Sequence, residues 1–203
     1  MPEAESRSLT VLVMDPLSLQ LSCACVPGTG QRRYEALAEH LKGALHRDVR
    51  LIFEESLSLG IKRSSGPIDL IVGKDAMVRF DARQAGVSFQ PVAALTGRDG
   101  GTELAGVFIV RSDGDLREIG QLAGKTIALG PVEEEETNGA GRRVLAAGSL
   151  LKDTRLVECG SIDAAALMVH DGEVDAAVVS DFLPPLLEGC GKLDPGSMRT
   201  IGK

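Results

Sequence analysis

Four consecutive glutamates, Glu133–Glu136, precede the small polar residues Thr137, Asn138 and Gly139. This segment follows an apolar run of strand length at 126–130 and leads into a helix-like segment. Hydroxyl and amide groups at a helix start can bind an anion, because the first N–H groups are unpaired and the helix dipole is positive there. Carboxylates at the same place favour a cation or an amine, or form a solvated first helical turn. The sequence therefore predicts either a ligand-binding loop or a solvated helix start.

Polar and charged side chains also follow the other apolar runs of strand length. Open parallel sheets bind ligands at the carboxyl ends of their strands, where loops meet helix N-termini. The candidates at such positions are Asp15, Ser56, Lys74, Asp75, Ser180 and Asp181. Lys74 could supply positive charge to an anion, and Ser56 could cap the short helix after it. Arg142 and Arg143 could reach an anion or pair with the preceding glutamates.

A second kind of chemistry is possible at Cys23 and Cys25, a C-x-C pair on the long loop after the first strand. Such a pair can chelate a soft metal such as Cu(I) or Zn, or react reversibly with oxidants. Two thiolates do not complete a metal site, so Met14, Cys159 or a histidine would have to join them. Structural or unpaired thiols and a disulfide to a distant cysteine, such as Cys190, are the alternatives.

The elements that must position these residues alternate between strand and helix. In the first half, apolar runs predict strands at 9–14, 49–55, 68–73 and 91–96. Helical spacing predicts helices near 31–46 and 75–85, with a short one after Ser56. The second half repeats the alternation from 104–111 through 124–130 to a strand at 174–180. This pattern is typical of parallel sheets covered by helices, and so of an α/β fold.

The turn-rich sequence TGRDGGTE at 96–103 suggests a boundary between two lobes. The predicted organisation is a flexible N-terminus at 1–8, a first lobe at 9–96, a hinge or crossing at 97–106, a second lobe at 107–197 and the start of a return strand at 198–203.

Composition excludes several classes of protein. A net charge of −7 over 203 residues makes a nucleic-acid partner improbable, and 43% hydrophobic residues suffice for a real core. Aromatic residues make up 3% of the chain and Trp is absent, which argues against a carbohydrate platform. No apolar run approaches the ~20 residues of a membrane span. The start, MPEAESRS, lacks the pattern of a signal peptide.

The sequences GKTIALG at 124–130 and GSIDAAALMVHDGEVDAAVVSD at 160–181 resemble the second lobe of type 2 periplasmic solute-binding proteins. The resemblance is to the phosphate, phosphite and phosphonate branch of ABC transporter components. It implies two lobes, each a mostly parallel sheet flanked by helices, with a cleft that closes on a small anion. It also implies a non-catalytic, periplasmic protein without a cofactor that hands its solute to an ABC permease. Relatives begin with a leader and continue beyond MRTIGK. We therefore expect the leader and the C-terminal return to be missing here.

The resemblance also assigns expected roles to residues. In this branch, the loop after strand 126–130 carries hydroxyls and amides that surround phosphoryl oxygens, and Thr137, Asn138 and Gly139 match that position. The loop containing Lys74 faces the cleft, and Asp181 meets the ligand or the hinge.

Other readings remain open. An enzyme on the same scaffold, similar to relatives in menaquinone biosynthesis, would act on a carboxylate in the cytoplasm, with Asp15, Asp75 and Asp181 as candidate acids or bases. A metal or redox module at Cys23 and Cys25 is another alternative. An incomplete first lobe would expose apolar surface and favour a homodimer.

Overall fold

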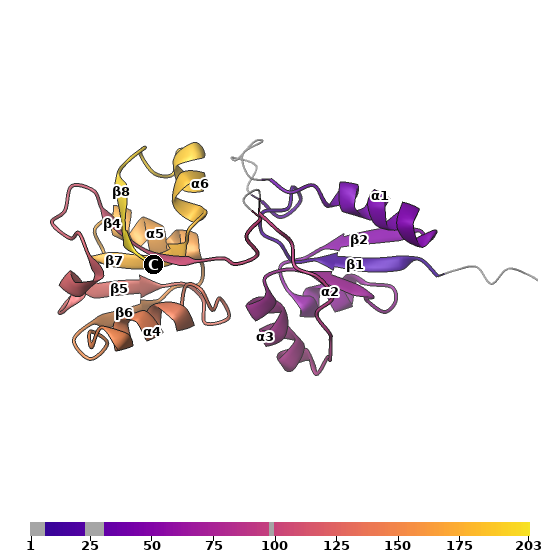
Figure 1. The fold of residues 1–203 in the computed structure, drawn as a ribbon, viewed down its shortest axis with the longest axis horizontal. Coiled ribbons are helices and arrows are strands. Elements are labelled where there is room, and N and C mark those ends of the chain that lie inside the picture. Colours follow the sequence, from indigo (N-terminus) through magenta and orange to yellow (C-terminus); the bar gives the residue numbers. More distant parts are fainter. Residues whose placement is uncertain (1–6, 23–30, 98–99) are drawn as a thin grey trace, which may run out of the picture. The chain divides into compact units, whose positions relative to one another are not determined.

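The computed structural model describes residues 7–22, 31–97 and 100–203, and the chain divides into two compact units between Gln90 and Pro91 (Figure 1). Each unit is an α/β structure with its own sheet, so the predicted fold class is confirmed. The finer limits predicted for the hinge and the lobes stay predictions. Cys23 and Cys25 lie outside the described residues.

The sheet of unit 1 has three parallel strands in the order β2-β1-β3. They are β1 (Leu9–Val13), β2 (Val49–Phe53) and β3 (Leu70–Val72). The central strand reads LTVLV, and its apolar residues are buried on both faces because helices cover both sides. β2 and β3 form the two edges and are only partly buried.

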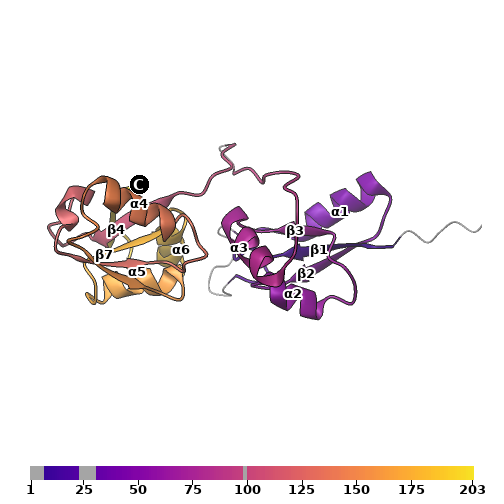
Figure 2. The same cartoon turned by 90° about the horizontal axis from the view of Figure 1, so that it is seen from below.

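Three helices flank this sheet: α1 (Tyr34–Leu45) covers one face, and α2 (Leu57–Arg63) and α3 (Asp75–Ala85) cover the other (Figures 1 and 2). The Ser56 hydroxyl accepts a hydrogen bond from the Leu59 N–H at 3.4 Å, so the predicted cap of α2 is confirmed. Gly86, at φ 65°, ends α3 in a conformation that favours glycine.

The sheet of unit 2 has five strands in the order β6-β5-β7-β4-β8. They are β4 (Gly106–Arg111), β5 (Thr126–Leu129), β6 (Arg155–Glu158), β7 (Ala176–Ser180) and β8 (Met198–Gly202). β5, β6 and β7 run parallel, whereas β4 is antiparallel to both of its neighbours. The carboxyl ends of β5, β6 and β7 therefore lie along one edge of the sheet, beside the amino end of β4.

One face of the unit 2 sheet is covered by η1 (Ile119–Leu122) and α4 (Gly139–Ala147), and the other by α5 (Ile162–His170) and α6 (Leu183–Gly189). Ala165 and Ala166 are fully buried on α5. Their small side chains let this helix pack closely on the sheet, and the core continues through Phe108, Leu129 and Val178.

Two segments differ from, or add to, the prediction. The strand predicted at 91–96 is wrong, because this segment forms no strand in the structure and Val92 is 77% exposed. Its apolar residues suit a strand, but no described neighbour supplies hydrogen bonds to it, and a strand requires a partner. At the end of the chain, β8 pairs with β4 and Ile201 is buried in the unit 2 core.

Candidate functional site

The loop between β5 and α4 carries the glutamate run, and it consists of turns. The N–H of Glu134 donates to the Pro131 carbonyl at 3.0 Å, and the N–H of Thr137 donates to the Glu134 carbonyl at 3.2 Å. The helix begins only at Gly139, with Asn138 as its N-cap residue. The interpretation of the glutamates as a first helical turn is therefore wrong, since these turns hold them before the helix.

The last glutamate of the run is fixed by the two neighbouring strands. Ser180, fully buried at the end of β7, donates its hydroxyl to the Glu136 carboxylate at 2.9 Å. At the start of β4, a Cβ on Gly106 would overlap the backbone carbonyl of Glu136. Only glycine permits this close approach of strand and loop.

Thr137 and Asn138 are buried and hold the loop together. The Asn138 amide donates to the Gly130 carbonyl at 2.8 Å, and its oxygen accepts from the Arg142 Nε at 3.0 Å. The Thr137 hydroxyl lies 3.4 Å from the Glu134 carbonyl, to which it donates. A Cβ on Gly130 would overlap the Thr137 side chain. We refer to Glu136, Thr137, Asn138, Arg142 and Ser180 as the unit 2 polar cluster.

The two arginines of α4 behave differently. Arg143 forms an ion pair with Glu135, as the sequence predicts. Arg142 instead pairs with Glu158 at the end of β6, at 2.7 Å between Nη2 and Oε1. Because Arg142 also contacts Asn138, it joins the carboxyl ends of β5 and β6, which sequence spacing did not reveal.

Asp181 lies next to the cluster in the chain and has contacts of its own. Its N–H donates to the Ala105 carbonyl at 2.9 Å, and its carboxylate lies 3.7 Å from the Lys203 Nζ. The structure therefore brings Thr137, Asn138 and Ser180 together and places Asp181 beside them.

In unit 1, Asp15 is the most enclosed of the candidate residues, with 6% of its surface exposed. Its carboxylate accepts from the Leu17 N–H at 3.0 Å, the Arg32 Nη1 at 3.0 Å and the Tyr34 hydroxyl at 2.6 Å. Burial, together with the hydrogen bond to Asp15, raises the pKa of Tyr34 well above its usual value. Tyr34 therefore stays a donor at physiological pH. Tyr34 begins α1 and packs on the sheet as part of the core, so its sequence position gives no sign that its hydroxyl binds Asp15.

The remaining candidates of unit 1 lie at the ends of β2 and β3. The Ser56 hydroxyl caps α2 and lies 3.2 Å from the Ser58 hydroxyl. Lys74 is the N-cap residue of α3, and Asp75 forms an exposed ion pair with Arg79 at 2.7 Å. Such a solvent-exposed pair stabilises the helix only slightly.

The described cysteines show no sign of metal binding. Cys159 and Cys190 have free thiols, and the Cys159 thiol lies 3.5 Å from the Met168 sulfur. Burial raises the pKa of Cys159, which makes its reactive thiolate less abundant. Within residues 7–22, 31–97 and 100–203, no three His, Cys, Asp or Glu side chains lie close enough to hold a metal ion.

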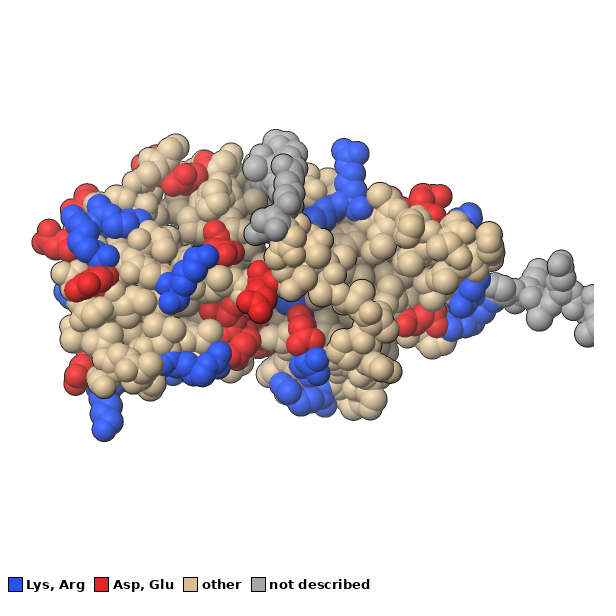
Figure 3. Space-filling model, viewed as in Figure 1, with Lys and Arg blue, Asp and Glu red and all other residues tan. Residues whose placement is uncertain are grey.

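Two surface properties bear on the type of partner. Lys and Arg side chains are interspersed with Asp and Glu on the face in Figure 3 rather than gathered in one basic patch. None of the helices in the described part of the chain is both long and apolar enough to cross a membrane.

Comparison with known proteins places this geometry in context. The sequence profile of a family described as the periplasmic phosphonate substrate-binding protein of ABC transporters matches residues 26–203. No curated protein sequence matched significantly.

Several solved structures are similar to this chain in fold. A binding component of an ABC phosphonate transporter from Pseudomonas aeruginosa superposes with a TM-score of 0.61 at 13% identity, covering 96% of this chain and 64% of that one. PhnD1 of Prochlorococcus marinus, in complex with methylphosphonate, gives 0.62 at 16% identity, covering 96% and 71%. A Xanthomonas citri protein bound to ATP gives 0.62 at 14% identity, covering 97% and 72%. These similarities confirm the predicted type 2 periplasmic binding-protein fold.

Proposed function

Because this chain belongs to the family of periplasmic phosphonate-binding proteins of ABC transporters, we propose that it binds a small phosphonate or phosphate ion. In this proposal it delivers the solute to a membrane permease and catalyses no reaction. The position expected from the sequence, between the two lobes, stays a prediction.

The observation that carries the proposal is the unit 2 polar cluster at the start of α4. Parallel sheets bind ligands at the carboxyl ends of their strands, and here the ends of β5, β6 and β7 are joined by Asn138, Arg142 and Ser180. The positive end of the α4 dipole favours an anion at this edge. Arg142 adds a guanidinium, the group best suited to phosphonyl oxygens, and a bound phosphonate would compete with Glu158 for it.

In unit 1, the corresponding strand ends carry Asp15, Ser56, Lys74 and Asp75. Of these, Lys74 has a positive charge and Ser56 a hydroxyl, both of which suit an anion. Asp15 serves in this proposal as a support, because its carboxylate is occupied by Arg32 and Tyr34.

An amine-bearing solute is the second candidate function, favoured by the four consecutive glutamates beside the cluster. Carboxylates attract an ammonium group and oppose a phosphonate dianion at the same distance. The two candidates therefore predict opposite effects for removal of one negative charge.

The test is calorimetric titration with phosphate, methylphosphonate and a simple alkylamine. Glu136→Gln keeps an acceptor for the Ser180 hydroxyl and removes the charge. If an anion binds here, the variant should bind methylphosphonate about threefold more tightly or better. If an amine binds, its affinity should fall by a similar factor. Glu173→Gln is the matched control, because Glu173 is exposed and precedes β7 at the opposite edge of the sheet.

The same titration can also refute the proposal. If the folded protein bound neither phosphate nor methylphosphonate, the anion proposal would be wrong. Phosphorus NMR of the recovered ligand gives a second readout. An unchanged spectrum supports binding without catalysis, whereas a new phosphorus signal would show that the protein transforms its ligand.

A further inference from the structure

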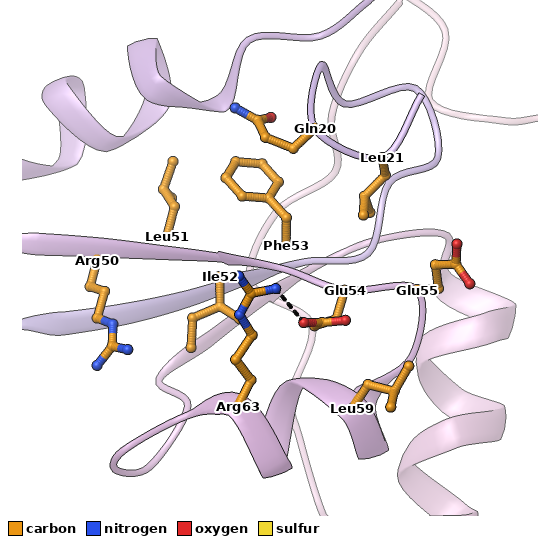
Figure 4. Close-up of a pocket in the computed structure, with 10 residues that line it drawn as sticks. All are labelled: Gln20, Leu21, Arg50, Leu51, Ile52, Phe53, Glu54, Glu55, Leu59 and Arg63. Atoms are coloured by element: carbon orange, nitrogen blue, oxygen red, sulfur yellow. Dashed lines mark hydrogen bonds and ion pairs between the residues drawn. The ribbon is translucent and has the colours of Figure 1, made fainter. Parts of the chain in front are cut away.

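Strand β2 forms an open edge of the unit 1 sheet. A hollow of about 510 Å³ runs along it and is lined by residues 50–53 of the strand and by Glu54 and Glu55 after it. Gln20 and Leu21 border the hollow on the α1 side, and Leu59 and Arg63 border it on the α2 side (Figure 4). Four consecutive strand residues and the adjoining Glu54 line the hollow, so it follows most of the length of β2.

The register of the sheet identifies which backbone groups of β2 face outward. On one side, Leu9 N–H donates to the Asp48 carbonyl at 2.7 Å, and Glu54 N–H donates to the Val13 carbonyl at 3.2 Å. Residues of a parallel strand alternate between its two neighbours, so 48, 50, 52 and 54 bond to β1. The N–H and C=O groups of Val49, Leu51 and Phe53 therefore point away from the sheet.

Within the described residues, no strand pairs with this edge, and the five residues of β2 include neither Pro nor Lys. Natural edges are shortened, carry Pro or Lys, or are covered by another element. The opposite edge, β3, has only three residues, but β2 has five and reads VRLIF. The residues whose backbone groups face outward, Val49, Leu51 and Phe53, are apolar and have high β-propensity, which favours pairing with a further strand.

The charged residues in β2 and next to it indicate which partner strand fits this edge, namely β2 of a second copy. If two copies of β2 pair antiparallel about a two-fold axis through Ile52, Leu51 lies opposite the partner's Phe53. Arg50 then lies opposite the partner's Glu54, and the same pair recurs across the axis. Two shifted registers are less favourable. An axis through Leu51 places Asp48 opposite the Glu54 of the second copy. An axis through Arg50 places the two Arg50 side chains opposite each other. Opposite charges on facing strands stabilise pairing, and like charges oppose it.

We propose that β2 is a homodimerisation edge, at which two copies of this chain join their unit 1 sheets antiparallel in the register centred on Ile52. Glu54 then lies between its own Arg63, at 2.6 Å, and Arg50 of the second copy. Arg50 reaches Ser65 at 2.6 Å within its own chain, which holds the guanidinium on the α2 side of the strand. The proposal gives the homodimer predicted from the sequence a defined surface, and it does not depend on the identity of the solute.

The test is sedimentation velocity of the full chain over a wide range of concentrations, with a reducing agent present so that cysteines cannot crosslink the copies. We expect a reversible dimer for the unaltered chain. Arg50→Glu places two glutamates opposite each other at both ends of the interface, and the dimer dissociation constant should rise about tenfold or more. Glu54→Arg should do the same through facing arginines.

Charge exchange tests the register itself. A mixture of the Arg50→Glu and Glu54→Arg chains should form a heterodimer, because each glutamate then faces an arginine. Leu51→Pro is a second kind of variant, since it removes an outward N–H that bonds nothing in the unit 1 sheet, and it should also yield monomers. Arg155→Glu on β6, an edge strand of unit 2, is the matched control and should leave the dimer unchanged.

Circular dichroism establishes that each variant is folded. A monomer at all concentrations of the unaltered chain would overturn the proposal. So would a dimer that persists in both charge variants and in Leu51→Pro. Failure of the mixed variants to associate would overturn the register.

Discussion

The two units share one alternation of strands and helices, but central strands and edge strands are enclosed to different degrees. All five residues of β7 in unit 2 are buried, whereas β2 in unit 1 has one buried residue and β3 has none. The difference arises because β7 lies between two strands and two helical layers, while β2 and β3 are edges. Similar apolar runs therefore contribute different amounts to stability in central and edge strands, depending on what covers them.

The strongest test of this contrast is a matched pair of leucine truncations. Leu129 in β5 is fully buried, and Leu70 in β3 is only partly buried. Leu129→Ala should lower the free energy of unfolding by about 2–5 kcal/mol because it leaves a cavity, and Leu70→Ala by about 1 kcal/mol. Urea unfolding followed by circular dichroism measures both values. Equal losses would show that the edge strand β3 is as well packed as the inner strand β5.

A smaller effect is expected at the glycines. Gly106→Ala should destabilise unit 2 by about 1–3 kcal/mol, because its Cβ would overlap the Glu136 carbonyl and push the loop away. Gly66→Ala in unit 1 is the control, since nothing lies within 4 Å of its added Cβ. Thermal unfolding of both variants tests this difference. An unaffected Gly106→Ala protein would mean that the loop moves freely.

The smallest effect concerns acid stability and compares one aspartate in each unit. A hydrogen bond from the Thr10 N–H, together with Arg7, lowers the pKa of Asp69, and the Ser161 hydroxyl with Lys192 lowers the pKa of Asp163. A lowered pKa stabilises the folded state above the unfolded pKa of ~3.9, and this contribution is lost as the pH falls through the folded value.

For these partly exposed carboxyls the contribution should stay below about 1 kcal/mol. Asp69→Asn should remove the contribution of this carboxyl to the loss of stability of unit 1 in acid. Asp163→Asn should do the same for unit 2. Urea titrations at neutral pH and near pH 3 measure the change. An Asp69→Asn protein with unaltered acid sensitivity would contradict the assignment.

Local patterns predicted most of the elements, because apolar spacing and caps act over a few residues. Ser56 was correctly identified as a cap from its position before a short helix. The prediction of a strand at 91–96 was wrong because a strand needs a partner that is distant in the sequence, and a local pattern carries no information about that partner. The prediction that the glutamates form a first helical turn was wrong for a related reason. Turns at Pro131 and Glu134 delay the start of the helix to Gly139.

The candidate site was less accessible to sequence reasoning than the fold. Strand-end positions correctly placed Thr137, Asn138 and Ser180 at one edge of a sheet. Their partners came from contacts between segments far apart in the chain. Arg142 with Glu158, and Asp15 with Tyr34, carry no spacing signal that distinguishes them from surface or core residues.

The glycine contacts at Gly106 and Gly130 have a consequence for how binding specificity can change. They fix the backbone path of the β5–α4 loop, while Glu135 keeps half of its side chain exposed. Substitutions at such outward positions can alter the chemistry presented to a solute without altering the loop's course. A change in loop length, in contrast, would require new residues at both glycines. This arrangement separates the part that evolution or an engineer can vary from the part that must be kept.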